Sequence, residues 1–114
     1  MKVGFIGLGN VGGKLAGSLL RNNFDLTVRD LDENLTKSFK DKGAKVVNSA
    51  NELAEQVDLI ITCLPSPKSC AEVMEADDGV INGLSENKIW LEMSTTDEAE
   101  IKRIGKKIIA KKAI

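Results

Sequence analysis

Short apolar runs alternate along the chain with longer stretches in which apolar residues recur every three or four positions. The runs at 3–6 and 59–64 are almost continuously apolar, which is typical of parallel strands covered on both faces. In the last stretch the apolar positions 101, 104 and 108 are all isoleucine, at helical spacing. Strands are predicted over Lys2–Gly7, Asp25–Arg29, Lys45–Val47, Asp58–Leu64 and Lys88–Met93. Helices are predicted over Asn10–Asn22, Glu33–Lys42, Asn51–Gln56, Ser66–Glu75 and Thr96–Lys112.

This alternation of strand and helix predicts an α/β fold, a doubly wound parallel sheet of the Rossmann type with five strands present. Ser49 and Thr95 each begin a capping-box pattern at a predicted helix start, and Gly43 fits a helix end. We find no repeat, low-complexity tract or linker, so residues 1–114 are expected to form one domain. A complete sheet of this type would have a sixth strand just beyond Ile114.

A glycine-rich segment joins the first predicted strand to the first predicted helix and fits the pattern GxGxxG. Its residues are Gly7, Leu8, Gly9, Asn10, Val11 and Gly12. In the helix that follows, Val11, Leu15 and Leu19 are expected to form one buried face. The position between an apolar strand and an amphipathic helix makes this segment a much stronger indication of dinucleotide binding than the pattern alone.

The three glycines have separate expected roles. Gly7 permits a tight turn, Gly9 lets the backbone approach a pyrophosphate, and Gly12 allows the helix to pack closely on the sheet. Free amides and the dipole at the helix start then attract the phosphates. The alternative, a glycine-rich turn that binds nothing, is disfavoured because the strand, the helix and a downstream acid occur together.

The downstream acid is Asp30, at the end of the second predicted strand and close to the expected spacing for a ribose-binding carboxylate. Its charge would repel a 2′-phosphate and therefore favours NAD. NADP stays possible, because the neighbouring Arg29 could pair with such a phosphate if its side chain points inward. Asp32 is expected to cap the second helix instead.

Further candidates follow the fourth and fifth predicted strands, at the carboxyl edge where open α/β sheets bind ligands. They are Leu64 and Pro65 after the fourth strand, and Ser94 and Thr95 after the fifth. Thr95 has two open interpretations, helix capping and cofactor contact, and one hydroxyl can do both. Pro65 can also simply end a strand.

The amino-acid composition of the chain excludes some classes of binding partner. The chain has 16 Lys plus Arg against 17 Asp plus Glu and no His, so no overall field recruits nucleic acid or an anionic membrane. No apolar stretch approaches the ~20 residues of a membrane span, and the N-terminus lacks a signal peptide, so we expect a soluble cytoplasmic protein.

Several other features have structural explanations. Cys63 and Cys70 are too few for a disulfide framework and cannot complete a typical zinc site without His, so both are expected to be free core thiols, with no metal bound. The basic run at 102–112 is expected to be a solvated helix face, and Trp90 a packing residue.

The motifs together resemble the 3-hydroxyisobutyrate dehydrogenase family of β-hydroxyacid dehydrogenases. The resemblance runs along the whole chain. It is carried by the segments Gly4–Gly12, Gly43-Ala44, Asp58–Thr62, Leu64-Pro65, Asp78–Val80 and Met93–Thr96.

The resemblance implies that this chain corresponds to the cofactor-binding part of an enzyme more than twice as long. An all-helical second domain would carry the catalytic lysine, and the full-length enzyme would be a homo-oligomer that transfers hydride between NAD and a small 3-hydroxy acid to give its semialdehyde. No catalytic residue is expected within residues 1–114. The resemblance also implies that Leu64, Pro65, Ser69 and Thr95 hold the cofactor with the glycine loop, Thr95 near the nicotinamide.

Two residues depart from the family's pattern. Val11 replaces the usual methionine of the loop, a mild change, and Asp30-Leu31 replaces the asparagine–arginine pair typical of NADP-using members. The second departure again favours NAD.

Two other functions remain as alternatives. One is a stand-alone NAD-binding regulatory module without catalysis. The other is a methyltransferase-like site for an adenosyl cofactor, which the third glycine of the loop disfavours.

Overall fold

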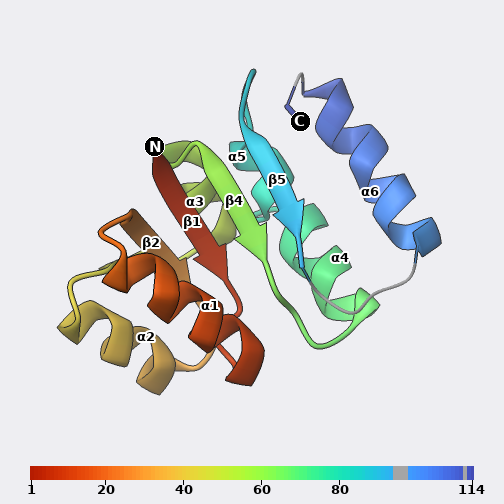
Figure 1. The fold of residues 1–114 in the computed structure, drawn as a ribbon. Helices are drawn as coiled ribbons and strands as arrows, with labels where there is room; N and C mark the ends of the chain where they lie inside the picture. The colour runs from red at the N-terminus through yellow and green to blue at the C-terminus, as the bar shows by residue number, and fades with distance from the viewer. Residues whose placement is uncertain (94–97, 112) are drawn as a thin grey trace.

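The computed structural model describes residues 1–93, 98–111 and 113–114. Its strands are β1 (Lys2–Ile6), β2 (Asp25–Arg29), β3 (Lys45–Val46), β4 (Leu59–Thr62) and β5 (Ile89–Glu92). Its helices are α1 (Asn10–Arg21), α2 (Glu33–Asp41), α3 (Ala50–Gln56), α4 (Pro67–Glu75), α5 (Val80–Gly83) and α6 (Glu98–Ala110). The strands form one parallel sheet in the order β3-β2-β1-β4-β5, which confirms the predicted fold class (Figure 1).

The sheet has a separate apolar core on each face. Helices α1 and α2 pack on one face, and α3, α4, α5 and α6 pack on the other (Figure 1). Successive residues of β1 point to opposite cores, because Phe5 belongs to the first and Ile6 to the second, and both are almost fully buried. The direction of winding reverses between β1 and β4, so their carboxyl ends form the edge at which such sheets bind ligands.

The helix ends predicted from capping residues are confirmed where the structure describes them. The Asp32 carboxylate accepts a hydrogen bond from the Asn34 amide (2.9 Å), and the Ser49 hydroxyl accepts one from the Glu52 amide (3.4 Å). Gly43 ends α2 with a φ of 104°, in the left-handed region that favours glycine. The predicted cap at Thr95 lies outside the described residues.

The end of β4 and the presence of α5 differ from the prediction, and the other described ends agree with it to within two residues. Strand β4 ends at Thr62 rather than Leu64, because the chain leaves the sheet after the Cys63 amide donates to the Ile6 carbonyl (3.0 Å). The four-residue helix α5 was not predicted, since a single turn is too short to show a helical period. It packs closely on α3, where a Cβ at Gly83 would overlap the Asn51 carbonyl oxygen.

The last described residue lies beside the edge strand. The Ile114 amide donates to the Lys88 carbonyl and the Trp90 amide donates to the Ile114 carbonyl, both at 2.7 Å. This pair of hydrogen bonds brackets Ile89 in the pattern of a parallel ladder. The chain at Ile114 is therefore parallel to β5.

None of the described helices is both long and apolar enough to pass through a bilayer.

An ion-pair group joins α4 to α6. The Glu75 carboxylate accepts hydrogen bonds from Arg103 and Lys107, and Arg103 also donates to Glu100 (2.9 Å from Nε). These bonds lower the pKa of Glu75 from 4.5 to about 2, first through Arg103 and then through Lys107. The basic residues of α6 are exposed as predicted, and two of them also fix the helix to its neighbour.

Replacing Glu75 with glutamine should lower the free energy of unfolding at pH 7 by about 1 kcal/mol, because the cations of α6 lose their charged acceptor. Since the pKa of Glu75 is lower in the folded chain, its stabilisation is present above pH 4.5 and is lost as the pH falls toward 2. Urea unfolding across this pH range measures the difference. The exposed Glu86→Gln is the matched control, and a Glu75→Gln difference that is independent of pH would contradict the assignment.

Candidate functional site

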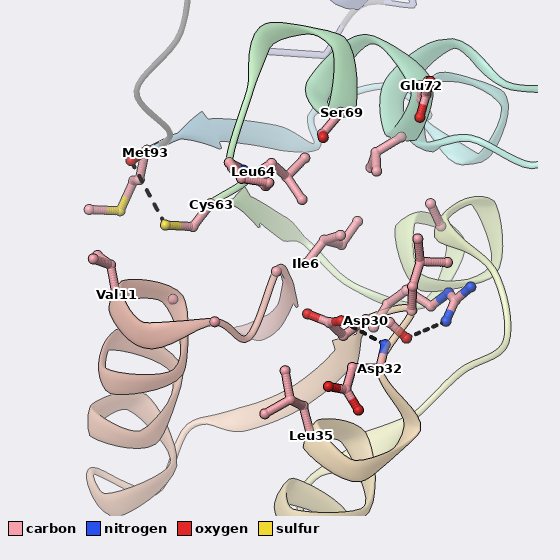
Figure 2. Close-up of a pocket in the computed structure, with 18 of the residues that line it drawn as sticks. Ile6, Val11, Asp30, Asp32, Leu35, Cys63, Leu64, Ser69, Glu72 and Met93 are labelled. Atoms are coloured by element: carbon pink, nitrogen blue, oxygen red, sulfur yellow. Dashed lines mark hydrogen bonds between the residues drawn. The ribbon is translucent and has the colours of Figure 1, made fainter.

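A cavity of about 830 Å³ opens at the carboxyl ends of β1, β2 and β4 (Figure 2). Its size lies within the usual range for small-molecule and cofactor sites. Its walls come from the glycine loop, the turn between β2 and α2, the start of α3 and the segment from β4 into α4. The lining residues are Ile6, Gly7, Gly9, Asn10, Val11, Gly12, Arg29, Asp30, Leu31, Asp32, Leu35, Ala50, Cys63, Leu64, Pro65, Ser69, Glu72, Val73, Asp78 and Met93.

The glycine loop, residues 7–12, makes a tight turn that only glycine allows at two positions. Gly7 has a φ of 101°, and a Cβ there would overlap the Cys63 carbonyl oxygen. A Cβ at Gly12 would overlap the Gly7 carbonyl oxygen, so the first turn of α1 lies directly against the loop. Gly9 differs, because a Cβ built on it meets no heavy atom within 4 Å. Gly9 therefore faces open space at the cavity.

The start of α1 presents backbone amides to this cavity. Gly9 occupies the N-cap without a side-chain hydrogen bond, and the first turn contains no acidic residue. The amide of Gly13 donates to the Gly9 carbonyl (2.6 Å), whereas the described residues provide no hydrogen-bond acceptor for the amides of Asn10, Val11 and Gly12. Such unsatisfied amides at the positive end of a helix bind phosphate groups well.

Asp30 lines the cavity beside the loop and is partly buried. One carboxylate oxygen accepts a hydrogen bond from the Leu8 amide (2.7 Å), and the other accepts one from the Asp32 amide (2.8 Å). Figure 2 shows the second of these bonds. Each carboxylate oxygen retains a lone pair, so the group can still accept hydrogen bonds from a ligand's hydroxyls.

Arg29 is the basic residue among those that line the cavity. Its guanidinium donates to the backbone carbonyl of Asp30 (2.6 Å), so it lies at the β2 end of the cavity. The carboxylates of Asp30, Asp32, Glu72 and Asp78 also line the walls. Four acids against one guanidinium make the cavity unfavourable for a ligand with an extra phosphate near these walls.

The predicted residues after β4 lie across the cavity from the loop (Figure 2). Leu64 is half-buried, Pro65 is exposed, and both line the cavity. Ser69 lies in the first turn of α4, where its amide donates to the Ser66 hydroxyl (3.1 Å) and the two hydroxyls are 2.9 Å apart. Thr95 lies outside the described residues.

Two expectations about side-chain direction need correction. Val11 was expected in a buried helix face but is 64% exposed and lines the cavity, because the face that packs on the sheet includes Gly12 and Ala16 instead. Cys63 was expected in the core but is half-buried at the cavity wall, since β4 has ended before it. The side chain of Leu8, another predicted cofactor-binding residue, is buried in the core, and its backbone belongs to the loop.

Sequence reasoning did not find most of the apolar lining. These residues come from five separate segments and share no motif, so only the fold brings them together. They are Ile6, Leu31, Leu35, Ala50, Val73 and Met93. Leu31 carried one signal, its position directly after Asp30, and Ile6 and Met93 lay in segments that carried the family resemblance.

A hydrogen-bonded group behind the cavity ties β4, β5 and α4 together. The Trp90 indole donates to the Thr62 hydroxyl (2.9 Å), which donates to the Glu92 carboxylate (2.9 Å). The Cys70 thiol donates to the same carboxylate oxygen (2.8 Å). Burial, and then the Glu92 carboxylate, raise the pKa of the Cys70 thiol, which stays an inert core residue as predicted. Trp90 packs against the core, also as predicted.

The family to which these features belong follows from a comparison with known proteins. Over residues 2–114 the sequence matches the family described as the NAD binding domain of 6-phosphogluconate dehydrogenase. The chain belongs to this family. The predicted resemblance is confirmed, because the NAD-binding domain is 35% identical over 106 residues to the mitochondrial 3-hydroxyisobutyrate dehydrogenase of Mus musculus. It is 36% identical over 110 residues to a probable mitochondrial 3-hydroxyisobutyrate dehydrogenase of Dictyostelium discoideum.

These matches cover most of this chain but a minor part of the relatives. The alignments include 93% and 96% of the NAD-binding domain and 32% and 34% of the two relatives. The chain therefore spans about a third of the length of the curated relatives it matches.

Solved structures agree with the fold. A 3-hydroxyisobutyrate dehydrogenase of Salmonella typhimurium has a TM-score of 0.90 at 25% identity, over 99% of this chain and 39% of that one. An imine reductase of Myxococcus stipitatus in complex with NADP⁺ has a TM-score of 0.88 over 99% of this chain and 38% of that one. Because the second is only 15% identical, it shows the fold alone.

Proposed function

We propose that the cavity binds NAD, and that this domain is the cofactor-binding part of a dehydrogenase that acts on a small 3-hydroxy acid. The observation that carries the proposal is the start of α1, where uncapped amides and an open Gly9 face the cavity beside Asp30. The pyrophosphate would bind at these amides, because free amides and the dipole at a helix N-terminus attract phosphate groups. The substrate class is supported by the identity to 3-hydroxyisobutyrate dehydrogenases.

The two ends of the bound dinucleotide would then contact different walls of the cavity. The adenosine would lie toward Asp30, whose carboxylate retains lone pairs for ribose hydroxyls, with Leu31 and Leu35 nearby as apolar lining. The nicotinamide would lie toward Val11 and Met93, which Figure 2 shows on the opposite side of the cavity. In this proposal Leu64, Pro65 and Ser69 contribute the facing wall.

When bound, NAD supplies the hydride acceptor for oxidation of the hydroxyl carbon. The residues of this domain bind and orient the dinucleotide, and their apolar side chains exclude water from it. Removing the hydroxyl proton needs a base. We propose that this base comes from outside residues 1–114, in agreement with the share of the relatives that this chain covers.

The domain should bind NADH more tightly than NADPH, because four carboxylates line the cavity and Asp30 lies where a 2′-phosphate would approach. Trp90 is the only tryptophan, so energy transfer from its emission to bound reduced nicotinamide reports binding directly. The same sample should not reduce NAD when 3-hydroxyisobutyrate is added. Equal affinity for NADPH would contradict the charge argument, and steady turnover would contradict the external base. Displacement of NADH by S-adenosylmethionine would favour the methyltransferase-like alternative.

A further inference from the structure

We infer that Asp30 is a positioning residue that holds the glycine loop in its phosphate-binding conformation, beyond any contact with ribose. The inference rests on the proposed dinucleotide function. It starts from the two hydrogen bonds of one side chain: Asp30 accepts from the Leu8 amide in the middle of the loop and from the Asp32 amide at the next turn. The carboxylate thus connects two walls of the cavity that are distant in sequence.

The loop has few other attachments to β2. The Gly7 amide donates to the Arg29 carbonyl at 3.2 Å, which is a longer contact than the 2.7 Å bond from Leu8 to Asp30. The Leu8 side chain is only 2% exposed, so it fixes the loop to the core below it. Among the described residues, the Asp30 carboxylate is the acceptor for the Leu8 amide. Removing it would leave that amide without a partner beside the core.

The position of the Leu8 amide determines that of the amides that follow. Leu8 lies between Gly7, whose backbone is in the left-handed region, and Gly9, which is the N-cap of α1. A rotation of the peptide at Leu8 would change the direction in which Gly9 and the first turn of α1 face the cavity. Because phosphate binding depends on several amides pointing to one place, loosening this peptide weakens binding of any pyrophosphate, with or without a 2′-phosphate.

The two roles of Asp30 predict opposite results for NADPH. If Asp30 only contacts ribose and repels a 2′-phosphate, then removing its charge leaves NADPH binding unchanged or makes it tighter. If Asp30 also holds the loop, then the same change weakens NADH and NADPH together. A neutral asparagine can satisfy only one of the two backbone amides at a time, since its other terminal group is a donor.

The test compares Asp30→Asn and Asp30→Ala with Glu33→Gln, which removes a nearby exposed charge that contacts neither the loop nor the cavity. Affinities for NADH and NADPH are measured by titration, and exchange of the Leu8 amide is measured by NMR in the ligand-free chain. We expect both affinities to fall about tenfold in the Asp30 variants, as for the loss of one hydrogen bond to a charged group. Leu8 exchange should become about tenfold faster while exchange in β1 and β4 stays unchanged.

Unchanged or tighter NADPH binding together with wild-type exchange at Leu8 would overturn the inference. Faster exchange spread over the whole sheet would also overturn it, because Asp30 would then stabilise the fold in general. Failure of the unmodified chain to bind either dinucleotide would refute the proposed function. In that case the exchange rate of Leu8 alone decides whether Asp30 holds the loop.

Discussion

Replacing Gly9 with valine should abolish NAD binding and leave the fold intact. The backbone of Gly9 is extended with a negative φ (φ −67°, ψ −163°), and a Cβ there meets no heavy atom within 4 Å among its neighbours. The new side chain would occupy the space through which a pyrophosphate reaches the amides of α1. We expect the affinity for NADH to fall at least about 100-fold, as for the loss of two hydrogen bonds to charged groups.

The free energy of unfolding of Gly9→Val should stay within about 1 kcal/mol of the wild-type value, the cost of a poor N-cap residue. Gly12→Ala is the contrasting variant. Its Cβ would overlap the Gly7 carbonyl oxygen and lie 3.3 Å from the Phe5 ring, so it should lose both binding and about 1–3 kcal/mol of stability. Urea unfolding and NADH titration separate the two cases. If Gly9→Val bound NADH with wild-type affinity, the phosphates would not lie against the glycine loop.

Replacing Leu31 with arginine should raise the affinity for NADPH about tenfold and change the affinity for NADH little. Leu31 is 89% exposed and lines the cavity directly after Asp30, so a guanidinium there reaches the region where a ribose 2′-phosphate would lie. Charge-assisted hydrogen bonds to phosphate supply the gain. The change keeps Asp30 and both of its hydrogen bonds to backbone amides, whereas an asparagine at position 30 could keep only one of them.

The control for this variant is Leu31→Gln, which removes the same apolar side chain without adding charge. It should leave the ratio of the two affinities near that of the unmodified chain. The gain of Leu31→Arg should also shrink as salt is added, since the new contact is electrostatic and exposed. An unchanged NADPH affinity would mean that the adenosine end of the ligand lies elsewhere in the cavity.

The parts of this molecule that depend on local signals could be predicted from the sequence. Apolar runs gave the strands of a parallel sheet, and Asp32, Gly43 and Ser49 marked helix ends through their own backbone chemistry. The glycine loop was found because Gly7 and Gly12 are required by contacts within a few residues or with the adjacent strand. Apart from the contact of Gly7 with Cys63, the deciding interactions join residues that are close in the sequence or belong to a regular repeat.

Features set by the arrangement of elements could not be predicted in this way. Whether Val11 turns toward the sheet or the cavity depends on how α1 rotates against β1, and helical spacing alone permits both. The direction of Cys63 depends on where β4 leaves the sheet. The bond from Asp30 to Leu8 joins residues 22 positions apart, so the spacing of the acid indicated a ribose ligand but not a support for the loop.

The different surroundings of the two cysteines give the molecule a natural site for chemical labelling. Cys70 is only 1% exposed and donates its hydrogen to Glu92, whereas Cys63 is half-buried at the wall of the cavity. A thiol-reactive dye would therefore modify Cys63 first, although burial raises the pKa of that thiol and slows the reaction. An occupied cavity would shield it further. The rate of alkylation at a single native residue thus becomes a measure of ligand occupancy that needs no engineered reporter.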